Sequence, residues 1–115
     1  MSFEYRIEEK EGVYIVYFNG RILDRSEAEN LMDEMEELMS SGKHDFVINL
    51  SGIDYMNSAG LGVLISLLNQ SRDEYGTLVL CSVPEKINQL IITSKLQNIF
   101  KLAETQEEAL KTFEK

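Results

Sequence analysis

The sequence predicts an α/β fold in which a mixed or largely parallel sheet of four to five strands carries about four helices. Two observations support this class. Short apolar runs alternate along the chain with segments of helical periodicity, as in β–α units. The chain has 115 residues, of which 43% are hydrophobic, and this is the size and apolar content of one domain with its own core. We therefore expect a single domain over residues 1–115.

The first two strands are expected to form an antiparallel hairpin. Apolar and polar residues alternate over residues 3–7 and again over residues 13–17, as in half-buried strands. A turn signal, Lys10-Glu11-Gly12, separates the two runs, and the second run ends at Asn19-Gly20.

From residue 24 the apolar period becomes that of a helix, which we expect to end near Gly42. The helix start is predicted to be a capping box, formed either by Asp24 with Glu27 or by Ser26 with Glu29. Its apolar face is marked by Leu31, Met35 and Leu38.

The second half of the chain continues the alternation. We expect a buried strand over residues 45–50, a loop, a helix reaching about residue 75, and a strand over residues 77–81. A helix should start around Pro84, bracketed by Ser82 and Glu85. A short edge strand over residues 99–102 and a last helix capped by Thr105 complete the prediction.

The most informative segment is the predicted start of the central helix, Asn57-Ser58-Ala59-Gly60-Leu61-Gly62. Loops at the carboxyl ends of strands are where α/β sheets place their binding sites. Glycines inside a helix cost about 1 kcal/mol each relative to alanine, so Gly60 and Gly62 should have a compensating role. One interpretation is that they leave the first-turn backbone open to a partner beside Ser58.

A second interpretation is purely structural. Asn57 or Ser58 would then be an ordinary N-cap, and the glycines would relieve packing against a neighbour. A serine nucleophile is disfavoured, because Met56 stands where a G-x-S-x-G motif needs glycine. The only histidine, His44, precedes the central strand and is expected at the opposite end from Ser58, so no base accompanies the hydroxyl.

Composition excludes several other classes. With 11 Lys+Arg and 20 Asp+Glu the net charge is −9, which disfavours nucleic acid and anionic membranes as partners. One cysteine and one histidine cannot supply a zinc site, and the sequence predicts no metal and no cofactor. No apolar run reaches the roughly 18 residues of a membrane span, and the start does not read as a signal peptide. We expect a cytoplasmic protein.

Several segments together resemble a known family. The run INLSGIDYMNSAGLGVLISLL, the turn Gly20-Arg21-Ile22-Leu23-Asp24 before it and the segment TLVLCSVPEKI after it are similar to the STAS domain. The resemblance extends to the closing TQEEALKTF and is closest to the bacterial anti-sigma factor antagonists. It implies a STAS-like fold and a binding module that is not itself an enzyme.

The resemblance also implies a mechanism, partner switching in transcription regulation. Ser58 matches the serine that an anti-sigma factor with serine kinase activity phosphorylates, and a metal-dependent serine phosphatase reverses this. The unmodified form would bind the kinase and free the sigma factor; ATP and Mg²⁺ would belong to the kinase alone. Asp24 matches the acidic residue of the family's turn. Asn57 departs from the family pattern, which has Asp there, and keeps its hydrogen-bonding shape without the charge.

The expected partner-binding surface surrounds Ser58. Tyr55 and Met56 are interpreted either as exposed apolar contacts for the partner or as anchors of the loop to the core. The predicted partner-binding residues are Asp24, Tyr55, Met56, Asn57, Ala59, Gly60, Leu61 and Gly62. The alternative function is that of a STAS adaptor or scaffold, acting without phosphorylation in another signalling or transporter-associated complex.

Overall fold

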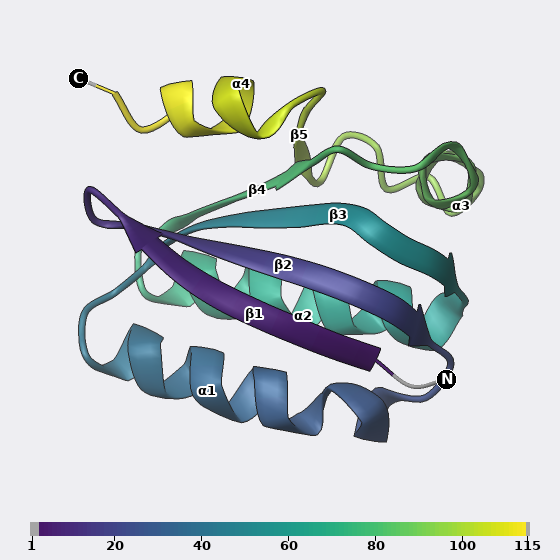
Figure 1. The fold of residues 1–115 in the computed structure, drawn as a ribbon, viewed down its shortest axis with the longest axis horizontal. Coiled ribbons are helices and arrows are strands. Elements are labelled where there is room, and N and C mark those ends of the chain that lie inside the picture. The colour runs from purple at the N-terminus through teal and green to yellow at the C-terminus, as the bar shows by residue number, and fades with distance from the viewer. Residues whose placement is uncertain (1–2, 115) are drawn as a thin grey trace.

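A five-stranded mixed sheet forms the centre of the computed structural model, which describes residues 3–114 (Figure 1). Its strand order is β1-β2-β3-β4-β5. The first pair is antiparallel and the other three pairs are parallel, which confirms the predicted hairpin and the mixed sheet. The strands are β1 (Phe3–Lys10), β2 (Val13–Ile22), β3 (Asp45–Met56), β4 (Thr77–Cys81) and β5 (Lys101–Ala103).

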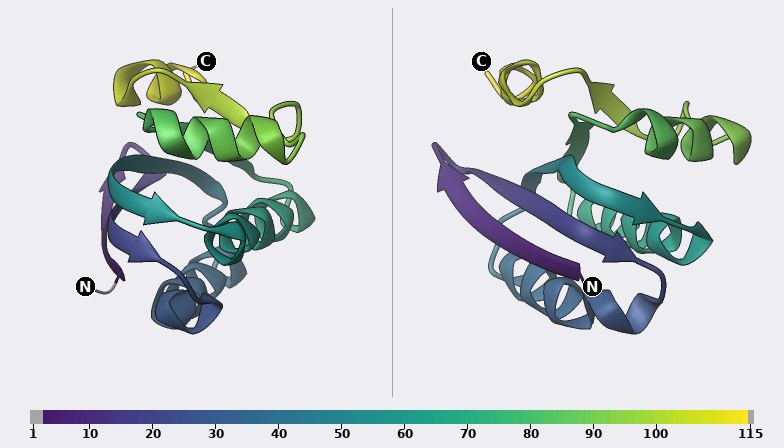
Figure 2. Two further views of the ribbon diagram at one scale, coloured as in Figure 1. Left: turned by 90° about the vertical axis from the view of Figure 1, so that its right-hand side faces the viewer. Right: turned by 45° about the vertical axis from the view of Figure 1, so that its right-hand side comes forward.

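Over the described residues, four α-helices and one 3-10 helix connect and cover the strands (Figures 1 and 2). They are η1 (Arg25–Ala28), α1 (Glu29–Ser40), α2 (Ser58–Asp73), α3 (Glu85–Thr93) and α4 (Gln106–Lys111). The buried residues of α1, α2 and α3 share one large core with one face of the sheet. The short helix α4 covers a smaller cluster on the other face. Within residues 3–114, no helix is long and apolar enough to cross a membrane.

Helix periodicity explains which side of α1 and α2 is buried. In α1 the buried side chains are Leu31, Met35 and Met39, which repeat every four residues and so face the sheet. The longer α2 buries seven of its residues and contacts α1 as well as strands β3 and β4. Gly42 has a φ of +93°, which glycine adopts at little cost, so it ends α1 as the sequence predicted.

The capping box of Asp24 and Glu27 is present, but it starts the 3-10 helix η1 rather than α1. Ala28, with φ −105° and ψ 11°, interrupts the helical path, and α1 begins at Glu29. The prediction of one helix from residue 24 was therefore wrong in this detail. Ser26 and Glu29 do not form the alternative capping box; the bond between them is a backbone one, in which the Glu29 N–H donates to the Ser26 carbonyl.

The central strand is longer than predicted. We expected residues 45–50 and then a loop, but β3 continues to Met56 and leads directly into α2. The reason is that β2 also extends, to Ile22, and its last residues pair with Tyr55 and Met56 across two register shifts. The parallel pairing supplies hydrogen bonds that local sequence signals do not reveal.

Two smaller expectations also need correction. The short edge strand is Lys101–Ala103 rather than residues 99–102, because Ile99 closes a turn by donating to the carbonyl of Leu96. Helix α3 has Pro84 as its N-cap and no side-chain cap, so Ser82 does not start it. Both changes lie away from the start of α2.

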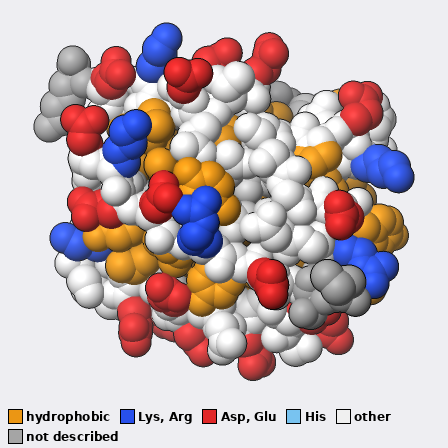
Figure 3. Space-filling model, viewed as in Figure 1, with side chains coloured by type: hydrophobic (Ala, Val, Ile, Leu, Met, Phe, Trp, Pro, Cys, Tyr) orange, Lys and Arg blue, Asp and Glu red, His pale blue; other side chains and the backbone are white. Residues whose placement is uncertain are grey.

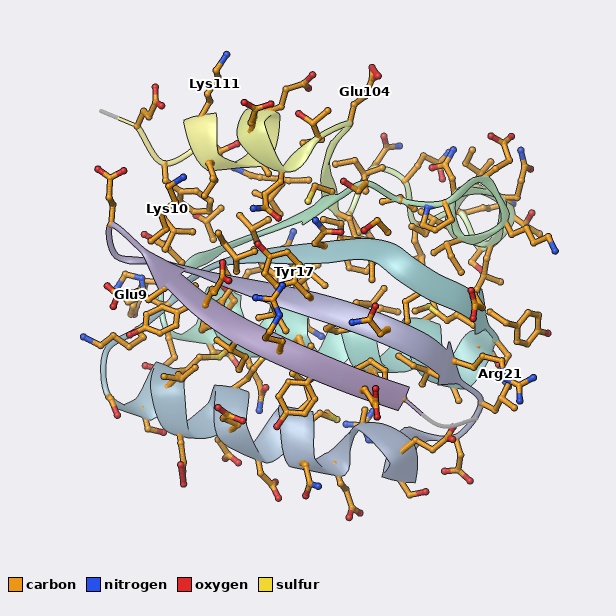
Figure 4. All side chains as sticks on the ribbon, viewed as in Figure 1. Glu9, Lys10, Tyr17, Arg21, Glu104 and Lys111 are labelled. Carbon is orange, nitrogen blue, oxygen red and sulfur yellow. The ribbon has the colours of Figure 1, made fainter. Side chains whose placement is uncertain are left out.

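A chain of polar contacts fixes α4 to the sheet. Asn49 of β3 donates to the Gln106 side-chain oxygen at 2.9 Å, and Gln106 donates to the Tyr17 hydroxyl at 3.1 Å. Tyr17 lies on the sheet face that Figure 4 presents to the viewer, with the Arg6 guanidinium 4.1 Å from its ring centre. Figure 3 shows mixed acidic and basic side chains over this face, with apolar patches between them.

Candidate functional site

Asn57 is the residue at which strand β3 becomes helix α2. Its backbone is extended, and its side-chain oxygen accepts hydrogen bonds from the backbone N–H groups of Ala59 (2.9 Å) and Gly60 (3.3 Å). The Leu61 N–H donates to the Asn57 carbonyl at 3.1 Å. The Asn57 side chain therefore satisfies two of the N–H donors that a helix start leaves free, and its carbonyl accepts the first bond within the helix.

Ser58 is the first residue of α2, and its side chain is exposed. Because Asn57 caps the helix, the Ser58 hydroxyl is not needed for capping. Among the hydrogen bonds of residues 3–114, none involves this hydroxyl. Of the two capping residues that the sequence left open, the structure selects Asn57, and it leaves Ser58 as an unengaged hydroxyl at the positive end of a 16-residue helix.

The two glycines of the first helical turns differ in their surroundings. A Cβ atom on Gly60 would collide with the Met56 side chain and lie 3.1 Å from Ile22 Cβ, whereas one on Gly62 would meet open space. Gly60 is thus required by packing, in agreement with the structural interpretation. Only Gly62 leaves the helix surface open, and the expectation that both glycines do so was half wrong.

Tyr55 and Met56 are consecutive residues of β3, so their side chains point to opposite faces of the strand. Tyr55 is 49% exposed, whereas Met56 is 4% exposed and belongs to the large core. The interpretation of Met56 as an exposed apolar contact is wrong, because the strand continues to this residue and turns its side chain inward. Leu61 and Gly60 are buried as well, so both lie beneath the surface around Ser58 rather than on it.

Asp24 lies on the segment between β2 and η1, next to the start of α2. Its carboxylate accepts from the Ser26 N–H at 2.9 Å, and this bond, together with one from the Ser26 side chain, lowers the pKa of Asp24. The carboxyl is fully exposed, so Asp24 presents a negative charge to solvent.

Leu23 is a surface residue that sequence reasoning missed. It is 42% exposed, directly precedes Asp24, and accepts at its carbonyl a hydrogen bond from the Asn57 side-chain nitrogen at 3.1 Å. The Asn57 N–H also donates to the Ile22 carbonyl at 3.4 Å. The available signal was an apolar residue immediately before an N-cap, which predicts a helix entry rather than an exposed contact.

The predicted site residues therefore fall into three groups. Asp24, Tyr55 and Ser58 are exposed, Asn57, Ala59 and Gly62 are partly exposed, and Met56, Gly60 and Leu61 are buried. At the same end of the molecule, Figure 4 labels Arg21, which pairs with Tyr55 across β2 and β3. The assignment of these residues to partner binding, and of Ser58 to phosphorylation, stays a prediction.

Among residues 3–114, the histidine lies far from Ser58. His44 contacts the Asp45 carboxylate at the start of β3, while Ser58 follows the end of that 12-residue strand. At roughly 3.3 Å per residue, the strand keeps the two side chains tens of ångströms apart. Within residues 3–114, no group of three or more His, Cys, Asp or Glu side chains is arranged to hold a metal ion.

The fold is thus a mixed sheet that begins with a hairpin, continues in parallel and carries an exposed serine at the start of helix α2. The family model described as the STAS domain matches residues 4–109, so the chain belongs to the STAS domain family. Whether residues 1–115 form a single domain stays a prediction.

Individual relatives agree with this assignment. The chain is 30% identical over 103 residues to BtrV of Bordetella bronchiseptica, a putative anti-sigma factor antagonist; the match covers 90% of this chain and 88% of BtrV. An anti-sigma factor antagonist from Mycobacterium paratuberculosis has the same fold, with a TM-score of 0.83, 24% identity and coverage of 96% and 93% of the two chains. The Bacillus cell fate determinant SpoIIAA, solved in its phosphorylated form, gives a TM-score of 0.76 at 18% identity and covers 96% of this chain and 100% of its own.

Proposed function

We propose that this chain is an anti-sigma factor antagonist switched by phosphorylation of Ser58. In its unphosphorylated form it binds an anti-sigma factor that is also a serine kinase, and the sigma factor is released. Phosphorylation by that kinase ends the interaction, and a metal-dependent serine phosphatase restores it. The observation that carries the proposal is the division of roles at the start of α2, where Asn57 caps the helix and Ser58 stays exposed.

This division lets the fold accept a phosphate at Ser58. The cap bonds from Asn57 do not involve the Ser58 hydroxyl, so modification leaves them intact. A helix N-terminus favours an anion by about 0.3–2 kcal/mol, which offsets repulsion from the net charge of −9. We therefore expect the phosphorylated chain to keep its fold.

The effect of the phosphate lies at the interface instead. Phosphoserine carries about −1.5 to −2 charges at neutral pH. Burying an unpaired charge against a surface that suits a neutral hydroxyl costs on the order of 3–5 kcal/mol. This corresponds to roughly a hundred- to several-thousand-fold loss of affinity. Local charge thus suffices for a switch, without refolding.

The exposed residues around Ser58 indicate the chemistry of the partner surface. Leu23 and Tyr55 offer apolar area, at 42% and 49% exposure, and Asp24 adds a negative charge. A complementary surface is apolar at its centre with a basic residue opposite Asp24. The chain's net charge of −9 would steer a basic partner toward it.

SpoIIAA, which shares this fold, was solved in a phosphorylated form, and this supports the proposed switch. The direct test is incubation with a candidate anti-sigma factor kinase and Mg-ATP, followed by intact-mass analysis. One added phosphoryl group is expected on the natural chain and on Ser26→Ala, which removes another exposed hydroxyl from the neighbouring segment. Ser58→Ala should gain none.

The adaptor alternative makes the opposite prediction. A chain that binds its partner but gains no phosphoryl group under conditions where the kinase modifies a known substrate would act as an unphosphorylated STAS adaptor. Phosphorylation that persists in Ser58→Ala would place the switch at another residue and contradict the proposal.

A further inference from the structure

The Asn57 side chain joins two segments that are 34 residues apart in sequence. Its oxygen faces the helix and accepts from Ala59 and Gly60, while its nitrogen faces the carbonyl of Leu23 at 3.1 Å. The two helix donors fix the orientation of the amide, because only oxygen can accept them. The nitrogen is therefore the atom that reaches Leu23.

The Leu23–Asp24 segment is held from two sides. On one side, Glu27 accepts from the N–H groups of Leu23 (2.8 Å) and Asp24 (3.1 Å). On the other side, Asn57 donates to the Leu23 carbonyl, and the Asn57 N–H donates to the Ile22 carbonyl at 3.4 Å. The Glu27 carboxylate holds the segment within its own turn, whereas Asn57 connects the segment to α2.

We propose that Asn57 is a positioning residue whose side-chain amide holds the Leu23–Asp24 segment against the start of α2 and so presets the surface around Ser58. The effect on partner binding rests on the proposed function; the tether itself does not. The amide is suited to both tasks at once, because it carries an acceptor for the helix and a donor for the carbonyl.

Other capping residues cannot do both. An ionised aspartate would accept from the helix N–H groups equally well, but it has no proton to donate, and its second oxygen would face the Leu23 carbonyl oxygen. A serine would cap the helix without reaching the carbonyl with a donor. Asn57→Asp and Asn57→Ser therefore retain a cap and remove the tether, one with an added charge and one without.

The tether is tested in the free chain by amide hydrogen exchange, resolved by NMR. In both variants we expect protection of the Leu23 and Asp24 amides to fall by roughly three- to tenfold, the factor that corresponds to one hydrogen bond. Amides of Val47 and Val79 in the sheet centre should keep their protection, because the core is not touched. Equal protection of Leu23 and Asp24 in all three chains would overturn the proposal.

Acidification gives a second readout that simple destabilisation would not produce. Once protonated, the carboxyl introduced by Asn57→Asp can donate to the Leu23 carbonyl, so protection should return in this variant and not in Asn57→Ser. Asp24 and Glu27 also carry carboxyl groups in this segment, so protection is referred to the natural chain at each pH. No difference between the two variants at low pH would contradict the donor role.

Partner affinity completes the test, with a candidate anti-sigma factor kinase as the probe. Both variants should bind about three- to tenfold more weakly than the natural chain. Asn69→Asp adds the same charge at an exposed position farther along α2 and should bind normally. Unchanged affinity in the untethered variants would overturn the presetting role. If the natural chain itself does not bind, the proposed function fails, and the exchange data still decide the tether.

Discussion

Gly60 packs so closely against Met56 that even a methyl group in place of its hydrogen would collide with the methionine side chain. The last residue of β3 thus lies under the first turn of α2, and the bare Cα of Gly60 makes this contact possible. This is why the strand can pass into the helix through Asn57 alone. The close contact fixes the direction in which α2 leaves the sheet, and with it the position of Ser58.

Gly60→Ala should therefore destabilise the fold. The added methyl group forces Met56 and Ile22 to shift, at a cost of about 1–3 kcal/mol for overpacking. Urea denaturation followed by circular dichroism measures the change. Gly62→Ala is the matched control: its methyl group meets open space, and better helix propensity should raise stability by up to about 1 kcal/mol. Equal effects of the two substitutions would refute this account of the turn.

Substitutions of Tyr55 and Met56 should have different effects, one on partner binding and the other on stability. Met56→Ala removes a side chain that is 4% exposed, and we expect a loss of about 2–5 kcal/mol in the free energy of unfolding. Tyr55→Ala should change stability by less than about 0.5 kcal/mol and weaken partner binding instead. Denaturation curves and isothermal titration calorimetry on both variants check this. If Tyr55→Ala bound the partner with full affinity, Tyr55 would not be part of the partner-binding surface.

Gln106 should be a stabilising residue of α4 despite its polarity. Gln106→Ala leaves the nearly buried Asn49 side-chain nitrogen without its acceptor, which costs about 1–3 kcal/mol. Glu107→Ala changes the exposed neighbouring position in the same helix and should cost less than about 0.5 kcal/mol. Thermal and urea unfolding of the two variants give the comparison. Similar losses of stability in both would show that the hydrogen bonds of Gln106 to Asn49 and Tyr17 contribute nothing specific.

Alkaline pH should weaken the contact between β1 and α1. Burial raises the pKa of Tyr5 to about 12, assisted by its hydrogen bond to Glu34 and by the charges of Glu34 and Asp33. The unfolded chain loses this proton near pH 10 and the folded chain only near pH 12, so stability falls as the pH rises through this interval. Tyr5→Phe should lose this part of the pH dependence. Identical unfolding profiles of the two chains between these pH values would contradict the assignment.

Features of this fold that depend on residues close together in the sequence could be predicted, and features that depend on distant residues could not. The hairpin, the helical faces and the capping box of Asp24 follow from local patterns, and the structure confirms them. The extension of β3 to Met56 does not, because it requires the end of β2 as a pairing partner. The sequence signal for the interruption at Ala28 is likewise absent, since alanine favours a continuous helix.

The same division holds at the candidate site. The motif located Ser58 and the residues around it, but it could not decide between Asn57 and Ser58 as the cap. That choice depends on backbone geometry, which places the Asn57 oxygen over two N–H groups and its nitrogen against Leu23. Burial of Met56 and exposure of Leu23 are likewise consequences of tertiary packing.

The most direct test of the switch compares charge with size at Ser58. Affinity for the candidate anti-sigma factor would be measured for the natural chain, Ser58→Asp and Ser58→Asn, whose side chains at this position differ from each other in charge but hardly in shape. Both variants should stay folded, because Asn57 keeps the cap. We predict a loss of about a hundredfold or more for Ser58→Asp and less than about tenfold for Ser58→Asn. Equal affinities of the two variants would contradict a switch that operates through charge.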